Sequence, residues 1–428
     1  MRILECTAER DTLSRLVQRG ASLDEQVLAR TREILRDVEQ HGDDAVLRYT
    51  REFDCPEIER VGLKITRREM EEAFAKVDPA FLRSLRRARR SITRFHKKQV
   101  PKSFTLKGRG LRLEQRFAPL DRVGIYVPGG KAAYPSTVIM NAIPARIAGV
   151  REIVMVTPAG RTGHIAPEVL VAAGECGVTE IYRIGGAQAI GALAYGTATI
   201  PPVDKITGPG NAYVAAAKRL VFGRVGIDMI AGPTEVVIIA DGSANPAFVA
   251  ADLIAQAEHD QEATPIAIVT SERLAPEIAA QITEQLKNNP RSGIAAKSFE
   301  QNGVIVVVSS LKDAAEIANT IAPEHLEIMT KNPRRVARRI RHAGAIFLGK
   351  WTSESLGDYI AGPNHTLPTS GTARFSSALS VYDFMKFSNV IECSRRGFLK
   401  LAPHAEILAA AEGLSGHASS LAIRRKSR

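Results

Sequence analysis

The sequence predicts an α/β fold with two parallel sheets, because short apolar segments alternate with amphipathic segments of roughly 10 to 15 residues. This alternation occurs in two blocks, which begin at Arg122 and near Gly232. The chain of 428 residues is also too long for one compact core, so two domains are expected. The two blocks therefore indicate two Rossmann-like units, each with helices on the faces of its sheet.

The hydrophobic pattern predicts the individual elements of each block. In the first block we expect strands at 123–130, 152–158 and 180–186, followed by helices at 136–150, 164–177 and 187–196. In the second block we expect strands at 234–241, 265–271 and 303–309, followed by helices at 245–259, 274–288 and 313–322. Strands that alternate with helices in this way are typical of βαβ units, whose strands run parallel.

The segments outside the two blocks have a different character. Residues 1 to about 100 are expected to be mostly helical, since apolar positions recur with helical spacing in 27–40 and 70–77. Segment 351–374 is rich in Gly, Pro, Ser and Thr, and we expect it to be a long loop that carries function. The C-terminal residues, with a helix around 404–414, are expected to form an appendage.

The composition is that of an ordinary globular protein, with 45% apolar and 24% charged residues. Cys6, Cys55, Cys176 and Cys393 are far apart and form no CxxC pair, which argues against a disulfide scaffold and against a thiolate zinc site. No apolar segment approaches the roughly 20 residues of a membrane span. The first residues also lack the apolar core of a signal peptide, so we expect a cytoplasmic protein.

The formal net charge of +12 raises nucleic acid or an anionic ligand as a possible partner. The excess lies in three segments, Arg83–Lys98, Arg334–Arg341 and Arg424–Arg428. The first is expected to be a long helix with a solvated basic face. Because aromatic residues that could stack on bases are few, at 5% of the chain, we favour solvated surfaces over a nucleic-acid interface.

Three glycine-rich turns follow predicted strands of the first block. They are Gly129-Gly130, Gly185-Gly186 and Gly208–Asn211, and each precedes a predicted helix. Backbone N–H groups and the helix dipole at such a turn can receive a phosphate. One such turn is more often an ordinary connection, but three in one block favour a nucleotide, bound without a G-x-G-x-x-G motif.

A metal site would have to be assembled from separate segments. Gln256 and His259 are three residues apart in a helical pattern and share one face, although such a pair alone is usually surface decoration. Asp358 lies in the long loop, and His417 lies in the C-terminal appendage. Without thiolates, a zinc ion would need nitrogen and oxygen ligands, as catalytic sites commonly use. Spacing alone leaves this open.

The Glu324-His325 pair is the strongest candidate for acid–base chemistry. It follows Pro323, which is expected to end the preceding helix. A carboxylate beside an imidazole offers two proton-transfer groups with different pKa values. Taken alone, the dipeptide is more often polar surface at a helix end, and His365 is a rival candidate base.

Several long segments resemble the histidinol dehydrogenase family, in the same order and at similar spacing. They are VGIYVPGGKAAYPSTVIMNAIPARIAGV, KITGPGNAYVAAAKRLV, GIDMIAGPTEVVIIAD, DLIAQAEHD, APEHLEI, GDYIAGPNHTLPTSGTARFSS and, near the end, EGLSGH. The resemblance covers essentially the whole chain. It implies two successive NAD-dependent oxidations of L-histidinol to L-histidine through the aldehyde, the last reactions of histidine biosynthesis, with one zinc ion in each active site of a homodimer.

The resemblance also implies roles for individual residues. The zinc ligands would be Gln256, His259, Asp358 and His417. His325 would accept the hydroxyl proton, and Glu324 would activate the water that hydrates the aldehyde. The substrate pocket would be lined by Thr234, Glu412, His325 and the zinc-ligating residues, and NAD would contact Tyr126, Gln188 and Asn211.

The domain organisation implied by the family has four parts. Residues 1–120 would form a helical N-terminal segment of the first domain, 121–233 an inserted NAD-binding domain, 234–385 the catalytic domain, and 386–428 an arm. The arm would cross to the partner subunit, so that His417 and Glu412 complete the neighbouring site.

Two alternatives to this function remain open in the sequence. The first is a related zinc-dependent enzyme that acts on another small polar alcohol, such as a sulfonated diol. The joint presence of Glu324, His325 and Glu412 favours histidinol. The second is a nucleic-acid-binding protein that uses the net positive charge.

Overall fold

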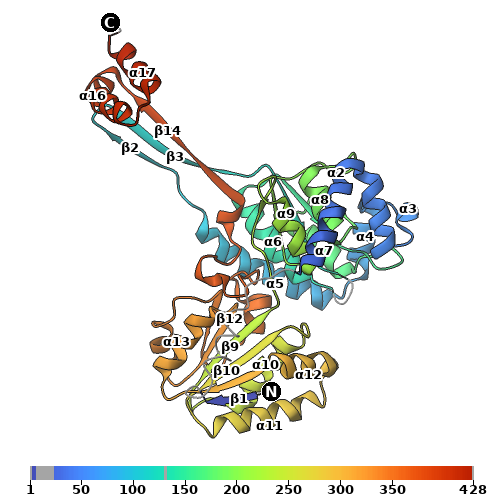
Figure 1. Ribbon diagram of the computed structural model, residues 1–428. Coiled ribbons are helices and arrows are strands. Elements are labelled where there is room, and N and C mark those ends of the chain that lie inside the picture. The colour runs from blue at the N-terminus through green and yellow to red at the C-terminus, as the bar shows by residue number, and fades with distance from the viewer. Residues whose placement is uncertain (1, 6–23, 130–132, 427–428) are drawn as a thin grey trace. The chain divides into compact units, whose positions relative to one another are not determined.

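The computed structural model describes residues 2–5, 24–129 and 133–426. The chain divides into two compact units, one made of Met1–Gln99 and Leu120–Phe384, the other of Val100–Pro119 and Met385–Arg428 (Figure 1). The larger unit contains two parallel sheets, which confirms the predicted α/β fold with two Rossmann-like parts. Among the described residues, no helix is both long and apolar enough to cross a membrane.

The first sheet has five parallel strands in the order β6-β5-β4-β7-β8. The strands are β4 (Arg122–Tyr126), β5 (Glu152–Val156), β6 (Glu180–Tyr182), β7 (Lys205–Thr207) and β8 (Gly226–Ile227). The helices between them are α6 (Pro135–Ala148), α7 (Pro167–Cys176), α8 (Gly186–Tyr195) and α9 (Ala212–Val221). The strand order reverses between β4 and β7, so the carboxyl ends of these two strands flank a crevice of the kind that binds ligands in such sheets.

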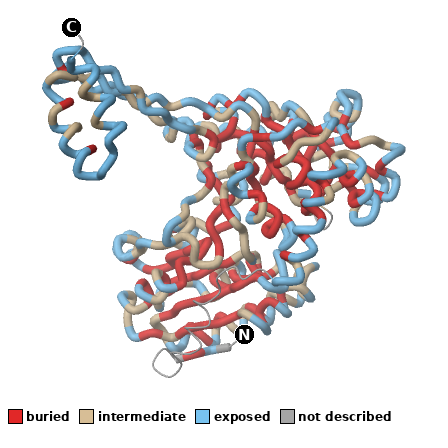
Figure 2. Tube along the Cα trace, turned by 45° about the horizontal axis from the view of Figure 1, so that its top comes forward, coloured by how far each residue is buried: buried red, intermediate tan, exposed pale blue. Residues whose placement is uncertain are grey.

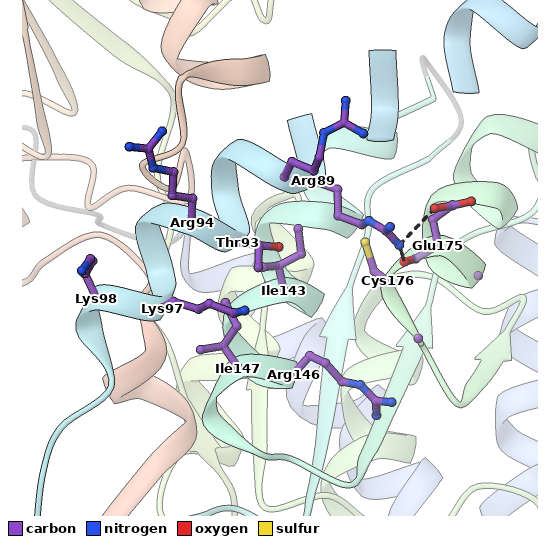
Figure 3. Close-up of a pocket in the computed structure, with 13 residues that line it drawn as sticks. Arg89, Thr93, Arg94, Lys97, Lys98, Ile143, Arg146, Ile147, Glu175 and Cys176 are labelled. Carbon is purple, nitrogen blue, oxygen red and sulfur yellow. Dashed lines mark hydrogen bonds and ion pairs between the residues drawn. The ribbon is translucent and has the colours of Figure 1, made fainter. Parts of the chain in front are cut away.

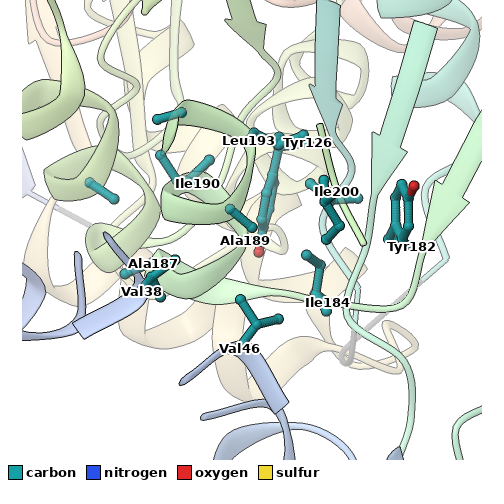
Figure 4. Close-up of a cluster of buried hydrophobic side chains, with 14 of the residues drawn as sticks. Val38, Val46, Tyr126, Tyr182, Ile184, Ala187, Ala189, Ile190, Leu193 and Ile200 are labelled. Atoms are coloured by element: carbon teal, nitrogen blue, oxygen red, sulfur yellow. The ribbon is translucent and has the colours of Figure 1, made fainter. Parts of the chain in front are cut away.

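Helices from the N-terminal part of the chain cover this sheet. They are α2 (Glu25–Phe53), α3 (Ile58–Val61), α4 (Arg67–Lys76), α5 (Pro79–His96) and the short η1 (Lys97–Gln99). Helix α2 packs on α8 and α9, and Val38 and Val46 of α2 face α8 in the buried core (Figure 4). The two helices approach closely at Gly191, where a Cβ atom would press on Leu35 and Val38. A larger residue at this crossing would require Leu35 and Val38 to shift by a few tenths of an ångström.

The second sheet has six parallel strands in the order β1-β11-β10-β9-β12-β13. The strands are β1 (Arg2–Glu5), β9 (Glu235–Ala240), β10 (Thr264–Val269), β11 (Val304–Val307), β12 (His325–Met329) and β13 (Ala345–Leu348). The helices are α10 (Pro246–Ala257), α11 (Leu274–Leu286), α12 (Ser292–Gln301), α13 (Leu311–Ile321) and α14 (Pro333–Ala337). The strand β1 was not expected in a segment predicted to be helical, and α12 was not predicted either.

After its first residue, Glu235, the central strand β9 is apolar because both of its faces are buried. Val236 and Ile238 pack with α10, α11 and α12 on one face. Val237 and Ile239 pack with α13 and Val336 on the other face. This burial on two sides explains the uninterrupted apolar pattern, since strands of a parallel sheet are covered on both faces. It also fixes the position of the residues at the two ends of the strand.

The segment predicted to be one long loop contains short helical turns. These are α15 (Glu354–Leu356), the π-helical turn η2 (Gly357–Ala361) and η3 (Thr372–Arg374), followed by η4 (Val381–Phe384). Turn η2 packs on α5, and the amide of Asn364 donates to the carbonyl oxygen of Met140 in α6 at 2.6 Å. The loop therefore binds elements of the first sheet while it follows β13 of the second.

The smaller unit is an antiparallel sheet with two helices. Strand β3 (Leu111–Pro119) pairs with β2 (Phe104–Gly108) and, along its whole length, with β14 (Met385–Cys393). Helices α16 (Arg395–Ala411) and α17 (Ser415–Lys426) pack on each other. Much of this unit is exposed (Figure 2), and Ile407 and Leu408 of α16 are each 67% exposed. An apolar surface of this kind on a helix favours contact with another protein surface.

Candidate active site

Three predicted site residues meet at the amino ends of the neighbouring strands β9 and β12. Thr234 directly precedes β9, Glu324 directly precedes β12, and His325 is the first residue of β12. The Thr234 hydroxyl donates to Oε2 of Glu324 at 2.6 Å, and the N–H of Glu235 donates to the same oxygen at 3.0 Å. The Glu324-His325 pair is thus not at a helix end, as the sequence pattern suggested, but at the start of a buried strand.

The imidazole of His325 is held by the backbone of β9. Its Nδ1 lies 3.1 Å from the carbonyl oxygen of Glu235, which assigns the proton of a neutral ring to Nδ1. Its Nε2 is buried without a hydrogen-bond partner and lies 3.7 Å from Oδ1 of Asp358. A buried acceptor with no partner is costly, so this nitrogen is suited to receive a proton or to meet a bound group.

The long loop adds a carboxylate that the sequence analysis did not select. Oε2 of Glu354 lies 3.9 Å from Nδ1 of His325, and the two residues and Asp358 offer ligand atoms within 4.8 Å of one another. Among the described residues, these three form a group that could hold a metal ion. Glu354 lies four residues before Asp358, in a loop already expected to be functional, and this spacing on a helical turn could have indicated it.

Burial and mutual charge shift the pKa values in this cluster. Burial lowers the pKa of His325, but the carboxylates of Glu354, Glu324 and Asp358 oppose it and raise that pKa well above its usual value. Burial also raises the pKa of Glu354 to about 8, with His325 acting in the opposite direction. Burial raises the pKa of Glu324 as well, which makes it a stronger base than an exposed glutamate.

The predicted zinc ligands of the larger unit lie around this cluster. Gln256 is fully buried at the end of α10, and its amide contacts both the Thr234 hydroxyl and the Glu354 carboxylate. Burial acts to raise the pKa of Asp358, but the charges of His325, His365 and His259 outweigh it and lower that pKa. Amide oxygen, imidazole nitrogen and carboxylate oxygen are a donor set that fits a catalytic zinc ion, and the unpartnered Nε2 of His325 faces the same space.

The remaining candidates of this group lie elsewhere. Glu412 follows α16 and His417 lies in α17, both in the smaller unit and both exposed. The rival candidate base His365 is directed to the loop backbone, with Nδ1 3.0 Å from the carbonyl oxygen of Asp358. Burial lowers its pKa. His365 therefore supports the turn that carries Asp358 and does not contact Glu324.

The candidate cofactor residues lie at the carboxyl edge of the first sheet. The Tyr126 side chain is buried at the end of β4, and its hydroxyl accepts the N–H of Gly186 at 3.1 Å. Gln188 is buried in the first turn of α8, and its Oε1 has no hydrogen-bond partner. Asn211 is exposed and caps α9 by accepting the N–H of Val214 at 3.1 Å. Tyr126, which precedes the first predicted turn, thus contacts the second predicted turn at Gly186. Gly130 of the first turn lies outside the described residues.

The third turn comes close to the same tyrosine. Gly208 has a φ of 108°, and a Cβ atom there would collide with the carbonyl oxygen of Tyr126. Its N–H donates to Asp228 at 2.8 Å, and the buried Lys218 donates to its carbonyl oxygen at 3.0 Å. Lys218 also forms a buried ion pair with Asp228. These contacts hold the backbone of the turn open at the crevice beside β4.

Asp54 is a titratable group beside this crevice, and it yields a prediction about stability. It lies 3.5 Å from the amide of Gln188, and burial raises its pKa to about 6. Between an unfolded pKa of about 3.9 and this value, the folded protein binds a proton that the unfolded chain releases, so stability falls as pH rises. Asp54→Asn is therefore expected to stabilise the protein by about 3 kcal/mol at pH 7.5 and by only about 0.5 kcal/mol at pH 4.

Chemical denaturation of the Asp54→Asn variant at both pH values tests this expectation. Asp44→Asn, which alters an exposed carboxylate of the same helix α2, is the matched control and is expected to change the free energy of unfolding little. A gain for Asp54→Asn that is equal at the two pH values would exclude the titration of Asp54 as its cause.

A buried acid–base pair with nitrogen and oxygen donors, together with glycine turns on a Rossmann-like sheet, is an arrangement that a dinucleotide-dependent dehydrogenase requires. Comparison with known proteins identifies the family. The sequence profile of histidinol dehydrogenase matches residues 17–425. The chain therefore belongs to the histidinol dehydrogenase family.

Individual relatives agree with this assignment. The chain is 52% identical over 416 residues to histidinol dehydrogenase of Gluconobacter oxydans, and these residues make up 97% of this chain and 96% of the relative. It is 53% identical over 405 residues to histidinol dehydrogenase 2 of a Nostoc species, with 94% of each chain covered. The crystal structure of histidinol dehydrogenase from Elizabethkingia anophelis superimposes with a TM-score of 0.93 at 35% identity, and covers 100% of this chain and 98% of that one.

Proposed function

We propose that this protein oxidises L-histidinol to L-histidine in two successive NAD-dependent steps, at a zinc-containing site shared between two subunits. The observation that carries the proposal is the cluster of Glu324, His325 and Asp358 in a protein of the histidinol dehydrogenase family. Two proton-transfer groups lie beside metal-binding donors, as a two-step oxidation of an alcohol requires.

Zinc would be held by Gln256, His259 and Asp358 of one subunit and His417 of the partner subunit. When bound, zinc supplies a positive charge that orients the substrate and stabilises negative charge on oxygen. A cation among these carboxylates would also offset the charges that raise the pKa of His325, and so favour the neutral imidazole that a base requires. The amino and imidazole groups of the substrate are expected to point toward these ligands.

The first step converts the alcohol to the aldehyde. Nε2 of His325 accepts the hydroxyl proton as the carbinol carbon loses a hydride, for which NAD⁺ would be the acceptor, so that the alcohol becomes the aldehyde. The hydrogen bond from Nδ1 to the Glu235 carbonyl keeps the Nε2 lone pair available. The cofactor would be held by Tyr126, Gln188 and Asn211 at the carboxyl edge of the first sheet.

The second step converts the aldehyde to the acid. Glu324 removes a proton from water as the water adds to the aldehyde. The resulting hydrate anion would then become the carboxylic acid by loss of a hydride, for which a second NAD⁺ would be the acceptor. Many aldehyde oxidations use a cysteine thiolate instead. Among the described cysteines, Cys55 and Cys176 are buried, and burial raises the pKa of Cys176 to about 12, while Cys393 belongs to the smaller unit. A carboxylate that activates water is the alternative that this chain offers.

The smaller unit would act as a dimerisation arm. Its exposed apolar residues on α16 favour contact with another chain, and its polar candidates Glu412 and His417 are exposed as well. We propose that Glu412 and His417 line the substrate pocket of the partner subunit, together with that subunit's own Thr234, Gln256 and His325. The site would then be complete only in the dimer.

The number of NADH molecules formed per substrate tests the function. With limiting L-histidinol and excess NAD⁺, we expect two NADH for each substrate molecule, with L-histidine as the product. A chelator is expected to abolish turnover, and added Zn²⁺ to restore it. Absence of turnover with L-histidinol, together with turnover of another small alcohol, would reassign the substrate and leave the dehydrogenase class intact.

A further inference from the structure

The basic segment of α5 is largely exposed, as the sequence pattern predicted, and it also lines a cavity. The cavity measures ≈ 1010 Å³ and lies between α5, α6 and α7 (Figure 3). Its cationic lining residues are Arg89, Arg90, Arg94, Lys97 and Lys98 from α5 and η1, and Arg146 from α6. Lys97 extends across the cavity toward Ile147 and Arg146, while Arg89 reaches Glu175. These cationic residues therefore line one concave surface.

Most of this positive charge is not neutralised by neighbouring carboxylates. Glu175 is the acidic residue of the lining, and it already pairs with Arg86 at 2.7 Å and with Arg89 at 3.0 Å. For the other cationic lining residues the described part of the chain provides no ion pair within 4.0 Å; these are Arg90, Arg94, Lys97, Lys98 and Arg146. Five cations around one cavity repel each other, so an anion in the cavity would be favourable.

Helix ends compensate only part of this charge. The C-terminal ends of α5, α6 and α7 all border the cavity, and basic residues are common at such ends because the helix dipole is negative there. Each end contributes about half a negative charge, or about 1.5 charges for three helices. Three helix ends therefore cannot balance five unpaired cations, and a surplus of positive charge remains.

We propose that this cavity binds a small anion that carries two or more phosphate groups. Arginine and lysine are the side chains that best bind phosphate oxygens, and the hydroxyl of Thr93 offers a further donor. A volume of ≈ 1010 Å³ exceeds what one phosphate group needs. The apolar side chains of Ile143 and Ile147 form part of the wall, which leaves room for an organic portion of the ligand.

A nucleic acid is a poorer fit to the same surface. No aromatic side chain is among the residues that line the cavity, so bases would have nothing on which to stack. The basic residues also surround a concave site between three helices and do not follow an extended groove. Both features favour a compact ligand.

The cavity is separate from the proposed NAD site. The glycine turns lie at the carboxyl ends of β4, β6 and β7, where α8 and α9 begin. The cavity lies where α6 and α7 end, and in a parallel sheet these helix ends are at the opposite edge, near the amino ends of the strands. Binding in the cavity is therefore expected to be independent of NAD.

Calorimetric titration of the full-length protein with inorganic tripolyphosphate tests the proposal. We expect saturable binding that persists with NAD present and that weakens at least about tenfold in the Lys97→Gln/Arg146→Gln double variant. Lys287→Gln/Lys297→Gln removes the same charge from exposed positions outside the cavity and is expected to leave the affinity within about twofold. ATP is the second probe: an affinity above that of tripolyphosphate would place a nucleoside against Ile143 and Ile147, and equal affinity would assign binding to the phosphate groups alone.

A third variant distinguishes the loss of phosphate contacts from damage to the fold. Glu175→Gln removes the carboxylate of the lining and frees Arg89, so we expect it to bind tripolyphosphate more tightly, which damage to the fold would not produce. The proposal is overturned if the wild-type protein does not bind tripolyphosphate, if NAD displaces it, or if both cavity variants bind like wild type. Tighter binding of a single-stranded oligonucleotide that depends on Lys97 and Arg146 would also overturn it.

Discussion

Replacement of Glu324 by Gln is expected to slow oxidation of the aldehyde by about 10² to 10⁴-fold, while oxidation of the alcohol falls far less. A glutamine can still accept the hydrogen bonds from Thr234 and Glu235 that hold this side chain, but it cannot accept a proton from water. Separate assays with L-histidinol and L-histidinal measure the two steps. The NADH yield per L-histidinol in the first minutes should drop from two toward one.

Glu327→Gln is the matched control for Glu324→Gln. Glu327 lies in β12, the strand that Glu324 directly precedes, is buried, and has a pKa raised well above its usual value by burial and by Asp252, which favours its neutral form. A neutral glutamine should replace it with little effect on either step. If Glu324→Gln slows both steps equally, Glu324 does not have the proposed role in hydration.

The second large effect is expected when two inactive variants are combined. His417→Ala removes the ligand that the arm would supply, and Glu324→Gln removes the base of the main unit, so each homodimer should be nearly inactive in the full reaction. A hybrid dimer contains one subunit of each variant. If the arms are exchanged, one site combines the main unit with Glu324→Gln and the arm with His417→Ala. The other site then carries neither substitution. Random mixing makes half of the dimers hybrids, and about a quarter of the wild-type activity should return.

The hybrid experiment requires that subunits mix, which co-expression with two different affinity tags ensures. Purification through both tags isolates hybrids, whose activity should be about half that of wild type. A mixture of His417→Ala with His417→Ala carrying the second tag is the control and should stay inactive. If the purified hybrid is also inactive, the arm does not complete the site of its partner.

The central strands could be predicted from the sequence because burial on both faces produces a run of apolar residues. Every residue of β9 is buried, and the pattern of 234–241 is correspondingly apolar. Strand β12 was not predicted, for the opposite reason. It begins with His325 and also contains Glu327, two buried polar residues whose hydrogen bonds to the backbone of Glu235 and Glu354 form only in the folded protein. The polar residues of the site thus interrupt the apolar pattern from which this strand could have been predicted.

Site residues that depend on distant contacts could not be predicted from local patterns. Glu354 becomes notable because folding brings it within 3.9 Å of His325, and Asp54 because it lies beside Gln188. In the same way, the basic segment of α5 forms a cavity only because the ends of α6 and α7 supply its other walls. Local periodicity indicated the helix correctly but carried no information on what faces it.

The β3–β14 ladder has a consequence for the order in which the chain folds during synthesis. All nine residues of β3 pair with β14, from Leu111 with Cys393 to Pro119 with Met385. A ribosome that adds roughly 5 to 20 residues per second needs roughly 10 to 50 s to pass from residue 119 to residue 385. During that interval one edge of the β2–β3 hairpin has no partner strand, and an open strand edge can pair with another nascent chain. The arm is therefore the last part to form, and crowding of ribosomes on one message would first affect this hairpin.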